Sequence, residues 1–214
     1  GRSFFGSLGV AEKDQVVVIN LREPGYFDRD QHALRNSKPQ DFRKAVNWLL
    51  SQGIKVVRIG HSDMSSMEVD RVGFYDLTKM NYPPEVDIYI CAKAMFYLGT
   101  SSGPFSLADQ FGTATLLFNE LPYCSRSNSL VNLLKFVDKH SQKLRTIADI
   151  NSIMGLDIYS ANVFSNCNLI PLPASGDEIL KTTKTMLDKL DSGELSQSQE
   201  LSFPKEYAFR FQGH

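Results

Sequence analysis

The residues with the clearest chemical potential form a short loop of small and hydroxylated side chains, Gly99-Thr100-Ser101-Ser102-Gly103. The loop follows a short apolar run and leads directly into a segment with helical spacing. Backbone N–H groups at the start of a helix, together with Thr and Ser hydroxyls, form a natural cradle for an anion. We therefore expect this loop to bind phosphate groups.

Two arginines follow or end the neighbouring predicted strands, Arg22 shortly after 16–19 and Arg58 within 54–59. A guanidinium group is permanently charged and can place two N–H groups on phosphate oxygens. Combined with the loop, the arginines predict a diphosphate ligand. The alternative is that they pair with acidic neighbours such as Glu23 or Asp63, and that the glycines only allow a tight turn.

The same loop also matches the G-x-S-x-G spacing of a nucleophile elbow, with Ser101 as the nucleophile. Such a hydrolase needs an acid and then a histidine later in the chain, where only His140 and His214 follow. Asp138 is too close to His140 to be an easy partner, and His214 is a poor place for a rigid base. A serine hydrolase is therefore the weaker alternative.

Motifs for metals and common cofactors are absent from the sequence. No GxGxxG follows the first predicted strand, and neither a P-loop lysine motif nor HExxH occurs. The four histidines lack the spacing of metal ligands. We expect no metal and no cofactor.

The overall composition limits the protein classes that need to be considered. The 214 residues are 42% hydrophobic and 22% charged, which is typical of a soluble globular protein. With 23 basic and 24 acidic residues, the net charge of -1 offers no basic surplus for general nucleic-acid binding. No apolar run approaches the ~20 residues that span a bilayer, and no signal peptide is visible. Three widely spaced cysteines indicate reduced thiols in a cytoplasmic protein.

The elements that must position the loop and the arginines alternate between strand and helix. The β-branched run Val16–Ile19 predicts a buried strand, and Ile54–Ile59 predicts the next one. Between them, Ser37 and Gln40 predict a capping box at the start of a helix that Gly53 ends. A strand–helix–strand unit with a short crossover has parallel strands. Ligands of such sheets bind at the carboxyl ends of the strands, where the loop and the arginines lie.

The remaining pattern extends this α/β arrangement, with Ser175 and Glu178 predicting a second capping box. The fold class is α/β, a Rossmann-like mainly parallel sheet flanked by helices. Further strands are predicted at 72–77, 95–98 and 113–119, and further helices at 83–92, 105–110, 130–137, 146–153 and 175–190. The stretch 83–92 would equally suit a strand.

Taken in order, the motifs resemble those of a family of bacterial glycosyltransferases linked to surface-polysaccharide synthesis. The segments that carry the resemblance are Leu21–Tyr26, Leu34–Asn36, Val56–Gly60, Phe96–Gly103, Phe111–Gly112 and Asn119. In that family the corresponding text runs like H-V-R-D-S-G-Y, Y-R-N, V-V-R-M-G, F-I-G-T-x-S-G and F-G-x-P. Two departures stand out: Asn20 replaces the usual histidine, and Glu23-Pro24 replaces Asp-Ser.

The resemblance implies the C-terminal, donor-binding domain of a GT-B glycosyltransferase, similar to that of fucosyltransferase-like enzymes. Carried over by position, Arg22 and Ser101–Gly103 contact the donor diphosphate, within a cradle that includes Gly99 and Thr100. Tyr26, Arg35, Asn36 and Arg58 shape the donor pocket. The general base often comes from the acceptor domain of such enzymes, so no catalytic residue is assigned in this chain.

The expected function is transfer of a sugar from a nucleotide-diphosphate sugar to a glycan acceptor, without a metal. The resemblance implies a linker-like segment at 1–14, a nucleotide-sugar-binding domain at 15–190, and a polar linker and tail at 191–214. The acceptor domain is expected to be missing or separate. The expected location is the cytoplasm, with a peripheral place at the inner membrane face as an option. The alternatives are a nucleotide- or phosphate-binding module without catalysis and the Ser101 hydrolase.

Overall fold

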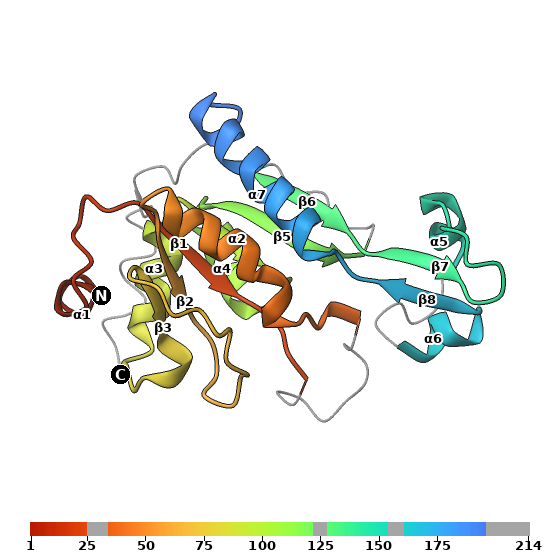
Figure 1. Cartoon of the computed structure of the whole chain (residues 1–214), viewed down its shortest axis with the longest axis horizontal. Coiled ribbons are helices and arrows are strands. Elements are labelled where there is room, and N and C mark those ends of the chain that lie inside the picture. The colour runs from red at the N-terminus through yellow and green to blue at the C-terminus, as the bar shows by residue number, and fades with distance from the viewer. Residues whose placement is uncertain (25–33, 122–127, 154–160, 196–214) are drawn as a thin grey trace, which may run out of the picture.

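The computed structural model of the protein describes residues 1–24, 34–121, 128–153 and 161–195 (Figure 1). Its centre is a six-stranded sheet in the order β3-β2-β1-β4-β5-β6, in which every neighbouring pair is parallel. The strands are β1 (Val16–Asn20), β2 (Lys55–Arg58), β3 (Phe74–Asp76), β4 (Phe96–Gly99), β5 (Ala114–Glu120) and β6 (Ser129–Leu133). The predicted Rossmann-like sheet is confirmed, including the parallel pairing of β1 with β2.

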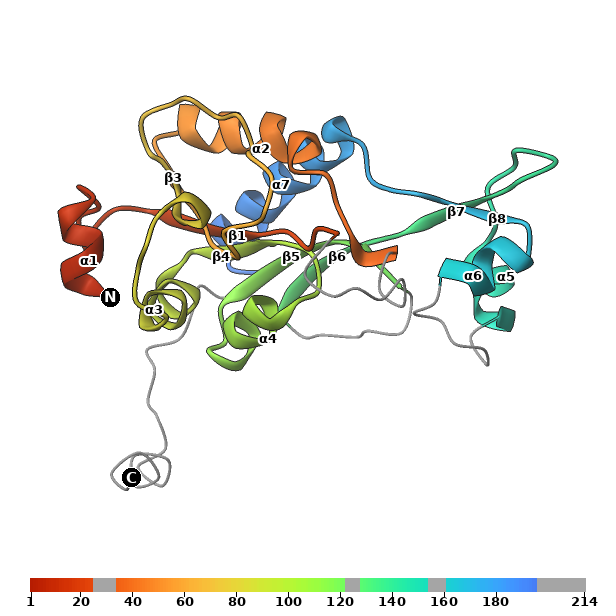
Figure 2. The ribbon, with the colours of Figure 1, turned by 90° about the horizontal axis from the view of Figure 1, so that it is seen from below.

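Helices cover both faces of the sheet (Figure 2). On one face lie α2 (Pro39–Ser51) and α7 (Gly176–Asp191), and on the other lie α3 (Glu85–Lys93) and α4 (Gly103–Gln110). The helix α1 (Arg2–Ser7) contributes Phe5 to the second face. Successive strand residues point to opposite faces, so β1 sends Val17 and Ile19 to the α2 side and Val18 to the α3 side. Both faces are buried, which explains the unbroken apolar run of β1.

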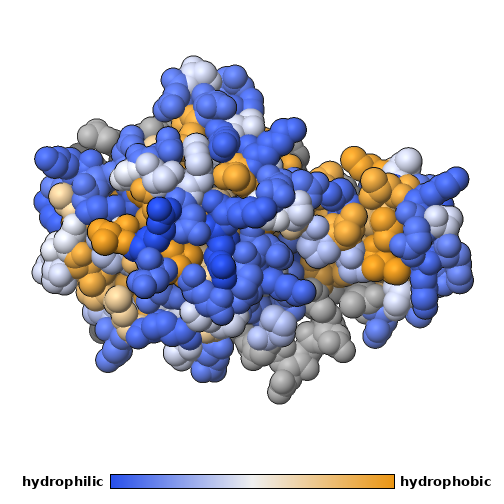
Figure 3. Space-filling model, viewed as in Figure 1, coloured by the Kyte–Doolittle hydropathy of each residue, from blue (hydrophilic) through white to orange (hydrophobic). Residues whose placement is uncertain are grey.

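A smaller unit extends from the sheet beyond β5 and β6 (Figures 1 and 2). It consists of the antiparallel strands β7 (Lys135–Asp138) and β8 (Leu169–Leu172), with the helices α5 (Ile147–Ile153) and α6 (Ala161–Asn166). The rings of Phe136 and Phe164 stack at 4.6 Å in its core. Figure 3 shows apolar side chains gathered on this unit, where Leu144, Ile147, Ile170 and Leu172 are exposed.

The prediction of a helix at 130–137 is wrong, because these residues form β6 and β7. Their apolar positions fit either period, and the backbone of β5 decides between them by pairing with β6. In β7, Phe136 and Asp138 turn inward while Lys135 and Val137 are partly exposed, which is the alternation of a strand. The ambiguous stretch 83–92 is resolved as the helix α3.

The two predicted capping boxes have different outcomes. Ser175 and Glu178 form a complete capping box at the start of α7, as predicted. The box at Ser37 and Gln40 is wrong, because the N-cap of α2 is Lys38 and no side chain caps the helix. The Ser37 hydroxyl is buried and instead accepts a hydrogen bond from Asn119 Nδ2 at 2.9 Å. Tertiary contact with the end of β5 therefore replaces the local cap.

Several predictions fall outside the described residues, among them Tyr26, Cys124, His214 and the tail at 201–214. The division into a linker-like start, a binding domain and a tail stays a prediction. Within the described ranges, no helix combines the length and apolar character needed to cross a bilayer.

Candidate functional site

A cavity of about 590 Å³ lies at the carboxyl end of the sheet. The chain order runs outward from β1 to β2 and β3 on one side, and from β4 to β5 and β6 on the other. The point between β1 and β4 is therefore the topological switch point, where ligands of open α/β sheets bind. The cavity walls come from the segments after β1, β2 and β4 and from α3, through Asn20, Arg22, Glu23, Gly60, His61, Met64, Asp87, Ser102, Gly103 and Pro104.

The loop after β4 is held against β1 by hydrogen bonds in which its hydroxyl groups accept and donate. Thr100 is buried, and its Oγ1 accepts a hydrogen bond from the backbone N–H of Arg22 at 2.8 Å. Ser102 Oγ donates to Asn20 Oδ1 at 2.8 Å and accepts from the Phe105 N–H as the N-cap of α4. The loop predicted from sequence is therefore fixed in place at the edge of the cavity.

Two further features beneath the loop fix its path. The hydroxyl of Tyr97 lies 3.1 Å from the Asn20 carbonyl oxygen and 2.9 Å from that of Thr100, and burial raises the pKa of Tyr97 far above its usual value. Gly99 passes so close to β1 that a Cβ atom there would lie 1.9 Å from the Asn20 carbonyl oxygen. This close approach therefore requires a residue without a side chain at position 99.

The first turn of α4 lies at the cavity. Gly103 is the first residue of α4 and lines the cavity, and within the described part of the chain its N–H has no hydrogen-bond partner. The next residue, Pro104, has no N–H at all. The free N–H and the helix dipole together favour an anion at this point.

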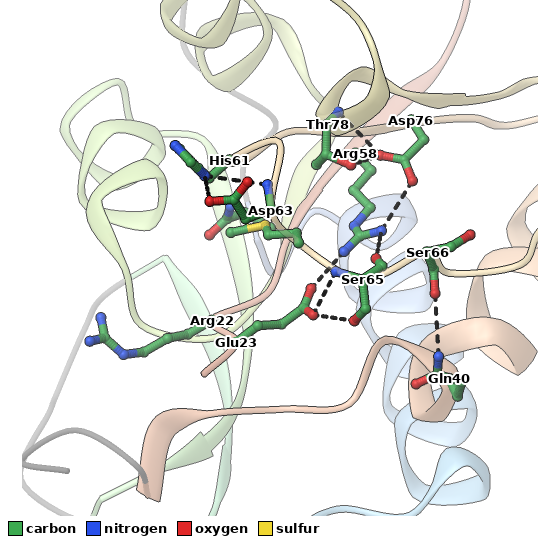
Figure 4. Close-up of polar contacts among 12 residues, drawn as sticks. Arg22, Glu23, Gln40, Arg58, His61, Asp63, Ser65, Ser66, Asp76 and Thr78 are labelled. Carbon is green, nitrogen blue, oxygen red and sulfur yellow. Dashed lines mark hydrogen bonds and ion pairs between the residues drawn. The ribbon is translucent and has the colours of Figure 1, made fainter. Parts of the chain in front are cut away.

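The structure places the backbone of Arg22 against this loop. Its N–H binds Thr100, and its carbonyl oxygen accepts from the Ser37 N–H at 2.8 Å. Figure 4 shows its side chain extending away from the cluster formed by Glu23, Arg58 and Ser65. Arg22 lines the cavity together with Gly103. A cation and a helix N-terminus thus share one cavity.

Arg58 lies elsewhere, in the ion-paired role that the sequence left open. Its side chain is completely buried and does not line the described cavity. Nη2 lies 2.7 Å from Glu23 Oε1, and Nη1 lies 3.0 Å from Asp76 Oδ2 and 2.7 Å from the Ser65 carbonyl oxygen (Figure 4). Its charge is paired with two carboxylates, so Arg58 has a structural role at the carboxyl end of the sheet.

Glu23 is the partner that sequence reasoning undervalued. Its Oε1 binds Arg58, and its Oε2 accepts from both the N–H and the hydroxyl of Ser65. This arrangement fixes the segment that carries His61 and Met64, two residues of the cavity wall. Glu23 therefore shapes the cavity through the 61–66 segment.

The other predicted residues have varied positions. Arg35 and Asn36 lie in the segment that Ser37 ties to Arg22, and neither is among the residues lining the described cavity. Ser101 is half-buried beside it, with its N–H donating to Glu120 Oε1 at 3.1 Å. Of the predicted residues that the structure describes, Arg22, Ser102 and Gly103 line the cavity, while Gly99 and Thr100 support the loop from below.

Sequence reasoning missed the role of Asp87, which reaches the cavity from the first turn of α3. Its Oδ1 accepts a hydrogen bond from the Tyr82 hydroxyl at 2.9 Å. Burial raises the pKa of Asp87, opposed by the Tyr82 hydrogen bond. The signal available in the sequence was the helix start at Pro83-Pro84-Glu85, but the packing of α3 beside α4 depends on tertiary structure.

The geometry gives little support to the serine hydrolase. The Ser101 N–H is bound to Glu120, and the neighbouring Ser102 hydroxyl serves as the helix cap. Asp138 accepts from the His140 N–H at 3.0 Å and pairs with Arg145, all within the smaller unit that contains β7. This is the arrangement of a turn, and it does not orient a histidine side chain toward Ser101.

Comparison with solved structures shows a similarity in fold. No protein-family model matches the sequence, and curated proteins give no match. Among solved structures, the chain is similar to the glycosyl transferase family 9 protein from Veillonella parvula DSM 2008, with 14% identity and a TM-score of 0.47. The match covers 87% of this chain and 50% of that protein, so the chain spans half of its length. At this level the similarity carries no argument about ligand or reaction.

Proposed function

We propose that this chain is the donor-binding domain of a glycosyltransferase and that it binds a nucleotide-diphosphate sugar between β1 and β4. The observation that carries the proposal is the cavity at the switch point, which Arg22 and Gly103 both line. Doubly wound sheets bind nucleotides at this place, with phosphate at a helix N-terminus. The order of motifs from Leu21 to Asn119 supports the narrower choice of a sugar donor.

In this proposal the protein stabilises the leaving group of the transfer reaction. When the bond between sugar and diphosphate breaks, negative charge develops on the diphosphate oxygens. In the proposal, Arg22 and the N-terminus of α4 interact with that charge as it develops, and they thereby stabilise the transition state more than the ground state. This role needs no metal ion. The acceptor domain binds the acceptor glycan and supplies the general base. The reaction takes place in the cytoplasm and serves surface-polysaccharide synthesis.

Calorimetric titration with GDP, UDP, ADP, TDP and CMP tests the binding step. We expect one nucleoside diphosphate to bind and Arg22→Ala to weaken it by about 10- to 150-fold, the range for a lost hydrogen bond to a charged group. Arg43→Ala is the matched control, because Arg43 is a half-exposed arginine on α2 that pairs with Glu68. If none of the nucleotides binds, or if both variants bind equally, the proposal is wrong.

A turnover assay separates the transferase from a binding module without catalysis. The purified chain is incubated with the nucleotide sugar that binds, with and without an acceptor-domain protein, and release of the nucleoside diphosphate is measured. A transferase domain releases it when the acceptor domain and a glycan are present. Binding without release under any of these conditions favours the binding module.

A further inference from the structure

Among the described residues, two carboxylates line the cavity, Glu23 and Asp87, and their surroundings differ. Both oxygens of Glu23 are engaged, one by Arg58 and the other by Ser65. Asp87 is half-buried and uses only Oδ1, which accepts from Tyr82. Nothing in the described ranges donates a hydrogen bond to Asp87 Oδ2. Asp87 is thus the carboxylate of this cavity with an acceptor oxygen left for a ligand.

The position of Asp87 relative to α4 follows from a neighbouring contact. Cys91 lies four residues after Asp87, so both side chains are on the same face of α3. Cys91 Sγ lies 3.6 Å from the carbonyl oxygen of Pro104, in the first turn of α4. The face of α3 that carries Asp87 is therefore turned toward the start of α4. Asp87 and Gly103 line the same cavity.

We propose that Asp87 accepts hydrogen bonds from the hydroxyl groups of a sugar ring that is joined to the bound phosphate. This inference rests on the proposed function and names the part of the ligand beside the phosphate. A carboxylate repels a phosphate, so it does not share the anion position at Gly103 and Arg22. A ligand that fits both the anion position and Asp87 carries an anionic group and, on an adjoining part of the same molecule, hydroxyl donors. A sugar phosphate has this chemistry.

The state of the Asp87 carboxyl agrees with this role. Burial raises its pKa, which means that partial removal from water disfavours the charged form. The hydrogen bond from Tyr82 compensates for only one oxygen. Hydroxyl donors from a sugar would satisfy the second oxygen, without adding charge to the cavity. The sugar is either the ribose of the nucleotide or the sugar to be transferred.

Titration of Asp87→Asn with four probes tests the inference: pyrophosphate, the nucleoside diphosphate that binds, its 2′,3′-dideoxy analogue and the nucleotide sugar. If ribose is the group, Asp87→Asn weakens the nucleoside diphosphate about tenfold and changes pyrophosphate less than about twofold. The dideoxy analogue shows the same loss on the wild-type protein, with no further loss on the variant. If the transferred sugar is the group, only the nucleotide sugar is weakened.

The control variant is Glu85→Gln, which makes the same change of charge at an exposed position in the same turn of α3. It should bind all four probes like the wild type. If Asp87→Asn does the same while Arg22→Ala loses nucleotide binding, the inference about Asp87 is overturned and the proposed function stands. An equal loss for pyrophosphate and nucleotide also overturns it. If the wild-type protein binds none of the probes, both are wrong.

Discussion

Arg58 Nη2 lies 2.7 Å from Glu23 Oε1, and neither side chain is more than 9% exposed. Through Nη1 the same guanidinium also reaches Asp76 and the Ser65 carbonyl oxygen. Glu23 follows β1, Arg58 ends β2 and Asp76 ends β3, so one side chain ties together three neighbouring strand ends. The contact also fixes the segment that carries His61, and thereby one wall of the cavity.

Replacing Arg58 should strongly destabilise the protein. Arg58→Met leaves two carboxylates at the sheet end without their cation, and breaking a buried pair costs about 3–5 kcal/mol. The free energy of unfolding in urea measures the effect. Arg43→Met is the control, because its pair with Glu68 is largely exposed and is worth about 1 kcal/mol or less. Equal losses in the two variants would mean that the buried network contributes no more to stability than the exposed Arg43–Glu68 pair.

A methyl group at position 99 should be poorly tolerated. The Cβ of Gly99→Ala would lie 1.9 Å from the Asn20 carbonyl oxygen, so β1 and β4 must move apart at the switch point. We expect a loss of about 3 kcal/mol or more in unfolding free energy. Gly103→Ala, in the same loop, places its Cβ in open space and should change stability by about 1 kcal/mol or less. Similar urea midpoints for both variants would contradict this account of the close approach.

Much of the fold could be predicted because its signals are local. One parallel strand–helix–strand unit follows from the β-branched run Val16–Ile19, the helix α2 and the run Ile54–Ile59. Its crossover is right-handed, as such connections almost always are. The capping box of Ser175 is equally local, since its two side chains lie three residues apart. The loop at 99–103 was found for the same reason: strand, glycines, hydroxyls and helix follow one another in the sequence.

The parts that escaped prediction depend on contacts between distant segments. The acidic partners of Arg58 are 35 and 18 residues away, so the sequence could offer pairing with Glu23 only as an alternative. Ser37 has the sequence context of a helix cap, but Asn119, 82 residues later, engages its hydroxyl. Asp87 reaches the cavity because α3 packs beside α4. No local pattern encodes such placements.

Ser37 and Asn119 should show energetic coupling. Asn119 has a φ of 58° and bridges two segments, donating to Ser37 Oγ and accepting from the Ala174 N–H. Ser37→Ala leaves a buried amide donor without its partner, at a cost of about 1–3 kcal/mol. A double-mutant cycle with Asn119→Gly should give a coupling energy of about 1 kcal/mol. Additive losses would indicate that the hydrogen bond contributes little.

Low pH should reduce the free energy of unfolding, partly through protonation of Glu178. The ion pair with Lys135, followed by the Ser175 N–H, lowers the pKa of Glu178 from 4.5 to about 2. Since the folded-state pKa lies below the unfolded value, this contribution is present above pH 4.5 and is lost as the pH falls toward 2. The gap in unfolding free energy between wild type and Glu178→Gln should therefore shrink from pH 6 to pH 3. Lys135→Met should reduce the same pH dependence, and a gap that stays constant would contradict the assignment.

The most direct test of the account follows the Gly103 amide by NMR during titration with the nucleoside diphosphate that binds. The account predicts that this resonance shifts strongly and saturably, together with that of Ser102, because phosphate binds at the first turn of α4. Arg22→Ala should abolish the shift at the same ligand concentration. Saturable binding that leaves Gly103 unchanged, with shifts instead around the smaller pocket lined by Phe5, Tyr89 and Lys93, would contradict it.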